Sequence, residues 1–196
     1  MKITNRAIIL LSLLSVSGCF FHSKPQNNTE FASIDNLKNI EGTYLNKGET
    51  DGKLVLFLSY ILWPKERSYQ ADSLIKYICI NVLENNSIKA DAYTDEGCVR
   101  EKIFSEGADF KIIQGRLRLI PKPSTAHGAG SPIAGPSSGY SELGLDRNGN
   151  GKYKSSWFSG GLVYMMLPFV GGETTEVRFV KLEKTPTHKL VPASQP

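Results

Sequence analysis

Apolar and polar residues alternate along most of the chain, which is the pattern of β-strands with one buried face. Within residues 109–121, Leu117 and Leu119 alternate with Arg116 and Arg118. The other segments of strand character are residues 42–46, 53–63, 74–84, 87–93, 98–104, 138–148, 151–158, 161–169 and 174–183. No long amphipathic helix pattern separates them. We therefore predict an all-β, mostly antiparallel fold of roughly nine or ten strands.

Local signals refine this pattern. The apolar run 53–63 ends at a Pro and predicts a buried strand, although a short apolar run equally allows a helix. The alternation changes phase at Gln114-Gly115, which predicts a bulge. Asn85-Asn86 is expected to form a two-residue turn between strands. The stretch 146–151, DRNGNG, begins like a calcium loop, but Trp157 stands where the bidentate Glu is needed, so we expect a hairpin turn.

A set of short strands with short connections normally forms a barrel or a sandwich. We expect one domain over residues 37–184, most simply an up-and-down β-barrel, because closure removes exposed edges. A β-sandwich is the alternative. One connection, residues 121–139, is long and lacks apolar periodicity. It is interpreted as a surface loop, a lid over a barrel mouth or a docking segment for another protein.

The amino terminus has the pattern of an export signal. Lys2 and Arg6 precede an apolar run of about ten residues, too short to cross a bilayer as a helix. The four residues Val16-Ser17-Gly18-Cys19 resemble the bacterial lipobox. The resemblance implies cleavage before Cys19 and acyl chains on Cys19, which together make a stable membrane anchor. An ordinary signal peptide with an incidental Cys is the alternative.

These signals define the expected organisation of the chain. Residues 1–18 are the signal peptide, residues 19–36 the lipidated Cys and a flexible tether, and residues 185–196 a flexible tail with three Pro. Phe20 follows the lipidated Cys where an Asp would indicate retention in the inner membrane. We therefore expect a lipid-anchored protein of the bacterial envelope, in the outer membrane and facing the periplasm.

The net charge of the chain is +4, and it falls by two when Lys2 and Arg6 leave with the signal peptide. This slight excess does not indicate a nucleic-acid partner. Cys79 and Cys98 remain in a chain expected to meet an oxidising compartment, which predicts a disulfide. Two buried free thiols are the alternative. No Cys has a nearby His or second Cys, so no metal site is expected.

Gly42-Thr43-Tyr44, at the start of the first strand of the domain, and Arg178, in the last, resemble features of the lipocalin family. There a Gly-x-Trp begins the first strand, and a late Arg packs over the Trp. Here Tyr44 takes the Trp place. The resemblance implies a barrel that encloses one apolar ligand, such as a fatty acid or phospholipid, and some bacterial lipocalins are lipid-anchored at the outer membrane.

The residues carry little sign of catalysis. Residues 135–139 match Gly-x-Ser-x-Gly, but Ser137 lies in a loop before a strand, whereas the hydrolase motif needs a strand before the Ser and a helix after it. His22, His127 and His188 lie in the expected tether, loop and tail, where no rigid element positions them. We therefore expect that the protein is not an enzyme and that it binds no cofactor. A hydrolase is the alternative.

Two functions agree with these features. In the first, the lipoprotein binds a lipid or other small apolar molecule in its barrel, lined by aromatic residues such as Phe57, Tyr77 and Trp157, which would equally serve as core. In the second, it is a structural or adaptor lipoprotein that docks to an envelope protein without a small ligand.

Overall fold

The computed structural model describes residues 18–52, 54–121, 133–134, 137–163 and 167–183. Its strands are β1 (Gly18–Ser23), β2 (Gly42–Leu45), β3 (Tyr77–Val82), β4 (Ile88–Thr94), β5 (Gly97–Phe104), β6 (Phe110–Ile113), β7 (Arg116–Leu119), β8 (Ile133–Ala134), β9 (Ser137–Leu145), β10 (Gly151–Val163), β11 (Leu167–Phe179) and β12 (Lys181–Leu182). Its helices are the short α2 (Leu58–Leu62) and α3 (Tyr69–Leu74) and the 3₁₀ turns η1 (Leu37–Ile40) and η2 (Pro64–Glu66).

The strands form two sheets. The larger has seven strands in the order β1-β11-β10-β9-β7-β6, with β8 beside the end of β10. The smaller has five, in the order β12-β2-β3-β4-β5. All pairings are antiparallel except that of β1 with β11, which is parallel. The mostly antiparallel all-β class predicted from the alternation is therefore confirmed.

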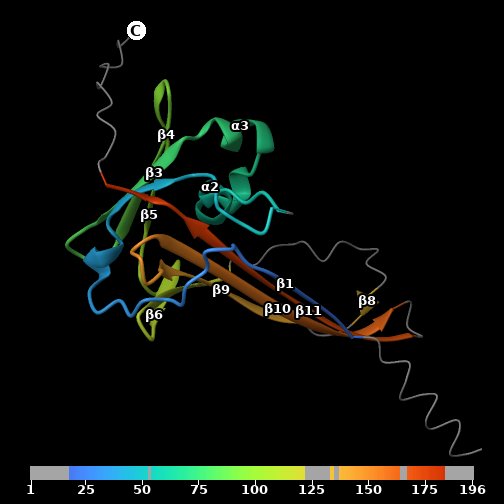
Figure 1. Ribbon diagram of the computed structural model, residues 1–196. Coiled ribbons are helices and arrows are strands. Elements are labelled where there is room, and N and C mark those ends of the chain that lie inside the picture. The colour runs from blue at the N-terminus through green and yellow to red at the C-terminus, as the bar shows by residue number, and fades with distance from the viewer. Residues whose placement is uncertain (1–17, 53, 122–132, 135–136, 164–166, 184–196) are drawn as a thin grey trace, which may run out of the picture.

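The long hairpin formed by β10 and β11 extends from the body of the molecule (Figure 1). β10 and β11 have 13 residues each, and they are paired from Gly151↔Phe179 out to Val163↔Leu167. Figure 1 shows this hairpin, with β9 and β1 alongside it, running out from the body that holds the smaller sheet and the helices. The turn that joins β9 to the start of β10 is the hairpin turn expected at residues 146–151. There a carboxylate oxygen of Asp146 accepts hydrogen bonds from the backbone N–H groups of Asn148 (2.9 Å) and Asn150 (2.8 Å).

The core lies between the two sheets at the body end. Ile78 of β3, Phe110 of β6 and Phe179 of β11 are at most 2% exposed and belong to one apolar cluster. Helix α2 closes one side of this core, because its residues Leu58 and Leu62 pack into the same cluster. Among the hairpin residues whose side chains the structure describes, those that pack into this core belong to the inner half.

The predicted strand over residues 53–63 is wrong, and the helical alternative holds for its second half. Leu58, Ile61 and Leu62 are all buried, and this spacing of three and four residues matches one face of a helix. Asn46 stabilises the start of α2, since its side-chain oxygen accepts from the backbone N–H of Ser59 at 2.9 Å. A buried helical turn therefore outweighs the β-strand character of these side chains.

The bulge expected at Gln114-Gly115 is instead a tight turn. Gln114 has φ 51° and Gly115 has φ 69°, and they join β6 to β7 as a two-residue hairpin loop. Both residues in the left-handed region are typical of the turn that matches strand twist. The change of phase in the apolar alternation therefore marks the reversal of the chain rather than an extra residue within one strand.

The predicted closed barrel is not formed. Among the described residues, the larger sheet ends at β1 and β6 and the smaller at β12 and β5, and neither closes on itself. A barrel needs hydrogen bonds around its whole circumference. The two open sheets around a shared core are nearer to the sandwich alternative.

The residues of the lipocalin resemblance lie in different surroundings from those that the family implies. Arg178 forms ion pairs with Glu49 (3.0 Å) and Asp146 (3.3 Å). The cation over the ring of Tyr44 is Lys181, whose Nζ lies 5.6 Å from the ring centre.

Candidate functional site

An apolar cavity of about 60 Å³ lies in the core between the two sheets. Its wall includes Tyr44, whose hydroxyl donates to the carbonyl oxygen of Ile40 at 2.7 Å, and burial raises the pKa of this hydroxyl. Pockets for drug-sized ligands measure roughly 300–1,000 Å³. The cavity is therefore far too small for a fatty acid or phospholipid without a rearrangement of the core.

The three residues expected to contact a ligand do not come together. Phe57 is 4% exposed, and its ring lies edge-on to that of Tyr60 at 5.2 Å. Tyr77 stacks on Tyr93 across β3 and β4, also at 5.2 Å. Trp157 is 45% exposed on the hairpin. None of the three lines the central cavity, so the structure does not bring them together around it, and a role in ligand binding stays a prediction.

The expected disulfide between Cys79 and Cys98 is also wrong, since both thiols are free. Cys79 is on β3 and Cys98 on β5, and β4 lies between these strands. Two strand spacings separate Cα atoms by roughly 9.6 Å, whereas a disulfide needs less than about 7 Å. Burial raises the pKa of both thiols, so neither is an activated nucleophile.

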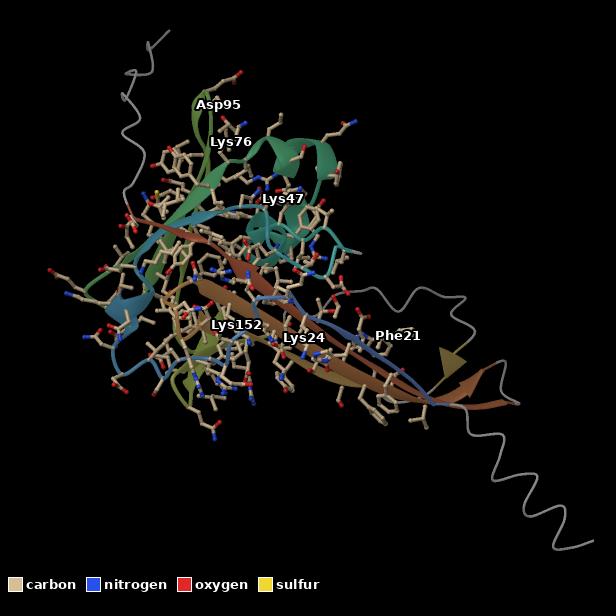
Figure 2. The ribbon with its side chains drawn as sticks, in the orientation of Figure 1. Phe21, Lys24, Lys47, Lys76, Asp95 and Lys152 are labelled. Atoms are coloured by element: carbon tan, nitrogen blue, oxygen red, sulfur yellow. The ribbon has the colours of Figure 1, made fainter. Side chains whose placement is uncertain are left out.

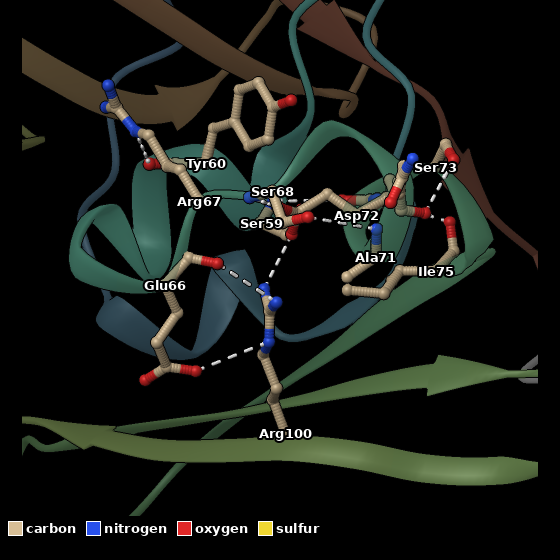
Figure 3. Close-up of polar contacts among 12 residues, drawn as sticks. Ser59, Tyr60, Glu66, Arg67, Ser68, Ala71, Asp72, Ser73, Ile75 and Arg100 are labelled. Carbon is tan, nitrogen blue, oxygen red and sulfur yellow. Dashed lines mark hydrogen bonds and ion pairs between the residues drawn. The ribbon is translucent and has the colours of Figure 1, made fainter.

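A polar cluster holds α3 against β5. Arg100 reaches from β5 to the fully buried carboxylate of Asp72 at 2.6 Å, and to a carboxylate oxygen of Glu66 at 3.4 Å (Figure 3). The second oxygen of Asp72 accepts from the backbone N–H of Ser68 at 2.8 Å. An open groove of about 350 Å³ runs beside this cluster and includes Lys76. Because these polar groups bind one another, the cluster stabilises the helices.

A second buried ion pair lies on the face of the larger sheet that points away from the core. Lys152 Nζ binds Glu176 at 2.8 Å, with side chains only 4% and 9% exposed. The amide of Asn28 completes the arrangement, because it donates to Glu176 at 2.7 Å and accepts from Lys152 at 2.8 Å. Burial raises the pKa of Glu176, but the bonds from Lys152 and Asn28 and the charges of Lys152 and Lys154 outweigh it, so the pKa lies below its usual value.

The segment that follows the lipobox-like motif is bound to the sheet, in contrast to the flexible tether that we expected. Gly18–Ser23 forms β1, paired along β11, and Asn28 then holds the chain to Lys152 and Glu176. Figure 2 shows Phe21 farther out along the hairpin than Lys24 and Lys152. β1 places Cys19 opposite Gly171, in the outer half of the hairpin. Of the expected signal peptide, residues 1–18, only Gly18 is described, and the whole of the expected tail, residues 185–196, lies outside the described residues.

The described residues of the hydrolase-like motif lack the expected surroundings. Ser137 is the first residue of β9, so a strand follows it where the motif needs a helix. His22 lies in β1, while His127 and His188 are outside the described residues. No cluster of potential metal ligands occurs in the part of the chain that the structure describes. Nor does any helix within that part have the length and apolarity to span a membrane.

Sequence reasoning missed the group of exposed aromatic residues on the hairpin. Phe20, Phe21, Trp157 and Phe158 are 45–69% exposed, and the pairing of β1, β11 and β10 brings them to neighbouring positions. One signal was available: residues 158–172 contain no Asp, Glu, Lys or Arg. The long-range pairing of β1 had no sequence signal, so Phe20 and Phe21 could not be assigned to this group.

Comparison with known proteins gave no match to a family model, to a curated protein or to a solved structure.

Proposed function

We propose that this protein is a bacterial lipoprotein that holds a β domain at an envelope membrane and acts there as an adaptor for a protein partner. The sequence Val16–Cys19 motivates the anchor, because it resembles the lipobox. The pairing of Cys19 with Gly171 is the observation that carries the proposal. This pairing supports the proposal because acyl chains on Cys19 would leave the protein from the protruding hairpin, without crossing the folded body.

Anchoring of this kind is stable because each buried methylene contributes about 0.8 kcal/mol and several chains act together. The residue after Cys19 is Phe20 rather than Asp, which supports sorting to the outer membrane, with the domain facing the periplasm. The hairpin then separates the membrane from the body, and leaves the body surface accessible to a partner.

The adaptor role is preferred to that of a lipid carrier because the central cavity measures only about 60 Å³. A lipocalin-like carrier remains the second candidate, favoured by the wholly apolar character of residues such as Ile80, Phe104 and Leu117 around that cavity. Carrying a lipid would require the two sheets to separate.

The anchor is tested by growing cells with labelled palmitate and comparing Cys19→Ala with Cys98→Ala. Cys98 is an exposed cysteine on β5, which makes it a matched control for loss of a thiol. We expect the Cys19 variant to take up no label and to retain residues 1–18, whereas the Cys98 variant is labelled and cleaved like the natural chain. Labelling of the Cys19 variant would disprove the anchor.

The adaptor role is tested by photo-crosslinking in cells from two exposed positions on the body, Tyr69 (65% exposed) and Ile103 (55% exposed). One reproducible protein adduct from either position is expected. Mass spectrometry of an organic extract of the purified protein provides the contrasting result. A stoichiometric lipid in that extract, together with no protein adduct, would favour the carrier instead.

A further inference from the structure

Five exposed aromatic side chains surround the hairpin within three neighbouring rows of the sheet. The register places Phe20 and Phe158 opposite Gly172, Phe21 and Trp157 opposite Glu173, and Tyr140 beside Ser156 in the next row. Their exposed fractions are 69% for Phe20 and Phe21, 47% for Phe158, 45% for Trp157 and 39% for Tyr140. We call these five residues the aromatic belt.

The belt occupies both faces of the sheet. Residues that pair across strands share a face, and successive residues alternate between faces. Phe20 and Phe158 therefore lie on one face, and Phe21 and Trp157 on the other. The missing side chain of Gly172 makes room for Phe20, because a Cβ there would lie 3.3 Å from its ring. A docking site for a protein normally uses one face, whereas aromatic side chains all round an element are typical of the membrane–water interface.

Beyond the belt the hairpin carries no charge. The sequence SGGLVYMMLPFVGG, residues 159–172, has no Asp, Glu, Lys or Arg, and neither have β8 or residues 137–141 of β9. The five β10 residues 159–163 continue outward for roughly 17 Å. This length is close to half the ~30 Å hydrocarbon thickness of a bilayer. The uncharged end therefore matches one leaflet and not a complete crossing.

Charged residues begin at the belt itself and continue towards the body. Glu173 lies within the belt and accepts a hydrogen bond from the indole N–H of Trp157 at 3.3 Å. Lys154, Glu176 and Glu142 follow closer to the body. Since a carboxylate is costly in hydrocarbon, Glu173 limits how deep the hairpin can enter. It puts the belt at the level of the lipid headgroups.

We propose that the outer parts of β10 and β11, residues 159–163 and 167–172, insert into the membrane leaflet that carries acylated Cys19, with the aromatic belt at the headgroup level. The inference rests on the proposed function, because the acyl anchor on Cys19 is what selects the membrane. The register puts Cys19 in the row just beyond Phe20 and Phe158, so the anchor and the inserted strands would enter the same leaflet. A lipid on one residue leaves the domain free to tilt and rotate. The inserted hairpin fixes its orientation, so the body is held at one height and presents one surface outward.

Trp157 allows a direct test, because the chain has only two Trp residues and the other, Trp63, is 4% exposed in the core. The processed protein, purified from membranes, is reconstituted into vesicles of phosphatidylethanolamine and phosphatidylglycerol that include a lipid with brominated acyl chains. We expect bromine to remove the Trp157 share of the tryptophan emission and aqueous iodide to have no effect on it. Trp157→Phe defines that share, and its remaining emission should respond to neither quencher.

Phe158→Asp, which puts a carboxylate into the belt, should abolish bromine quenching of Trp157 and restore quenching by iodide. Tyr69→Asp, an equally drastic change at a 65% exposed body position, should leave both signals unchanged. Quenching of Trp157 by iodide but not by bromine in the natural sequence would overturn the insertion. Protection from both quenchers would also overturn it, since a protein would then cover the belt.

Mass spectrometry of the purified chain shows whether it carries acyl groups, and so distinguishes failure of the anchor from failure of the hairpin insertion. A chain without acyl groups contradicts the proposed function, and the same vesicles are then added to that chain. Bromine quenching of Trp157 would still support insertion of the hairpin, and its absence would refute it.

Discussion

Replacing Lys152 with Met removes the cation that holds the amino-terminal segment on the larger sheet. Lys152 Nζ binds Glu176 at 2.8 Å, the side chain of Asn28 at 2.8 Å and the carbonyl oxygen of Thr29 at 2.5 Å. Met keeps a long unbranched stem beneath the ring of Phe31, which lies 5.1 Å from the Lys152 ammonium. The substitution therefore removes the charge and its hydrogen bonds with little change in packing.

The expected loss of unfolding free energy is about 3 kcal/mol. Removing one partner of a buried ion pair costs roughly 3–5 kcal/mol, because the other charge is left buried without compensation. The side chains of Lys152 and Glu176 are 4% and 9% exposed, which places the pair in this class. Lys154, at 3.5 Å from Glu176, remains as a second cation and moves the expected value to the lower end of the range.

Urea denaturation of Lys152→Met, Glu176→Gln and the double variant measures this free energy. We expect the double variant to lose much less than the sum of the two single losses, with a coupling of about 2 kcal/mol. Lys76→Met is the control, because Lys76 pairs with Asp95 at 3.3 Å while the side chains are 56% and 82% exposed (Figure 2). An exposed pair contributes less than about 1 kcal/mol. Equal losses for Lys152→Met and Lys76→Met would refute the reasoning.

The pH dependence provides an independent check on the same pair. The pKa of Glu176 is lower in the folded protein than its ordinary value. Its contribution to stability is therefore complete above the ordinary carboxyl pKa and is lost as the pH falls through the lowered folded pKa. Between neutral and acid pH the natural protein should lose more stability than Glu176→Gln. Parallel pH profiles would show that Glu176 contributes nothing.

Three further experiments have defined outcomes. Asp72→Ala should lower the unfolding free energy in urea by about 3 kcal/mol, because it leaves Arg100 without its buried partner at 2.6 Å. Asp72→Asn should lower it less, and an equal loss for both variants would show that hydrogen bonding at this position is unimportant. Without reductant, the exposed Cys98 should react with iodoacetamide before the partly buried Cys79. Both thiols should react faster as the pH rises towards their raised pKa values. Mass spectrometry that finds either thiol blocked would contradict the free cysteines. Gly115→Ala should lower the melting temperature by several degrees, because Gly115 has φ 69° and a Cβ would lie 2.6 Å from a backbone nitrogen; an unchanged melting temperature would contradict the tight turn.

Features of the fold that depend on neighbouring residues along the chain could be predicted from the amino-acid sequence. Alternation of apolar residues predicted β2, β4 and β5, and Asp146 with its Asn-Gly repeats marked the turn between β9 and β10. The β10–β11 hairpin was predicted wrongly as three strands, because the chain reverses within the segment 161–169 that was expected to be one strand. Such signals are local, because strand period and turn geometry act over a few residues. The motif at Cys19 is local too, and its prediction of lipidation stays a prediction.

The pairing of distant strands could not be predicted in this way, and the candidate functional features depend on that pairing. Cys79 and Cys98 are only 19 residues apart in sequence, yet β4 separates them in the sheet and keeps them unbonded. Cys19 and Gly171 are distant along the chain, yet β1 sets them side by side. Pairing between distant strands depends on the total burial and hydrogen bonding of the whole chain, which no short stretch of sequence contains. The aromatic belt exists only because that pairing brings three strands to the same end of the molecule.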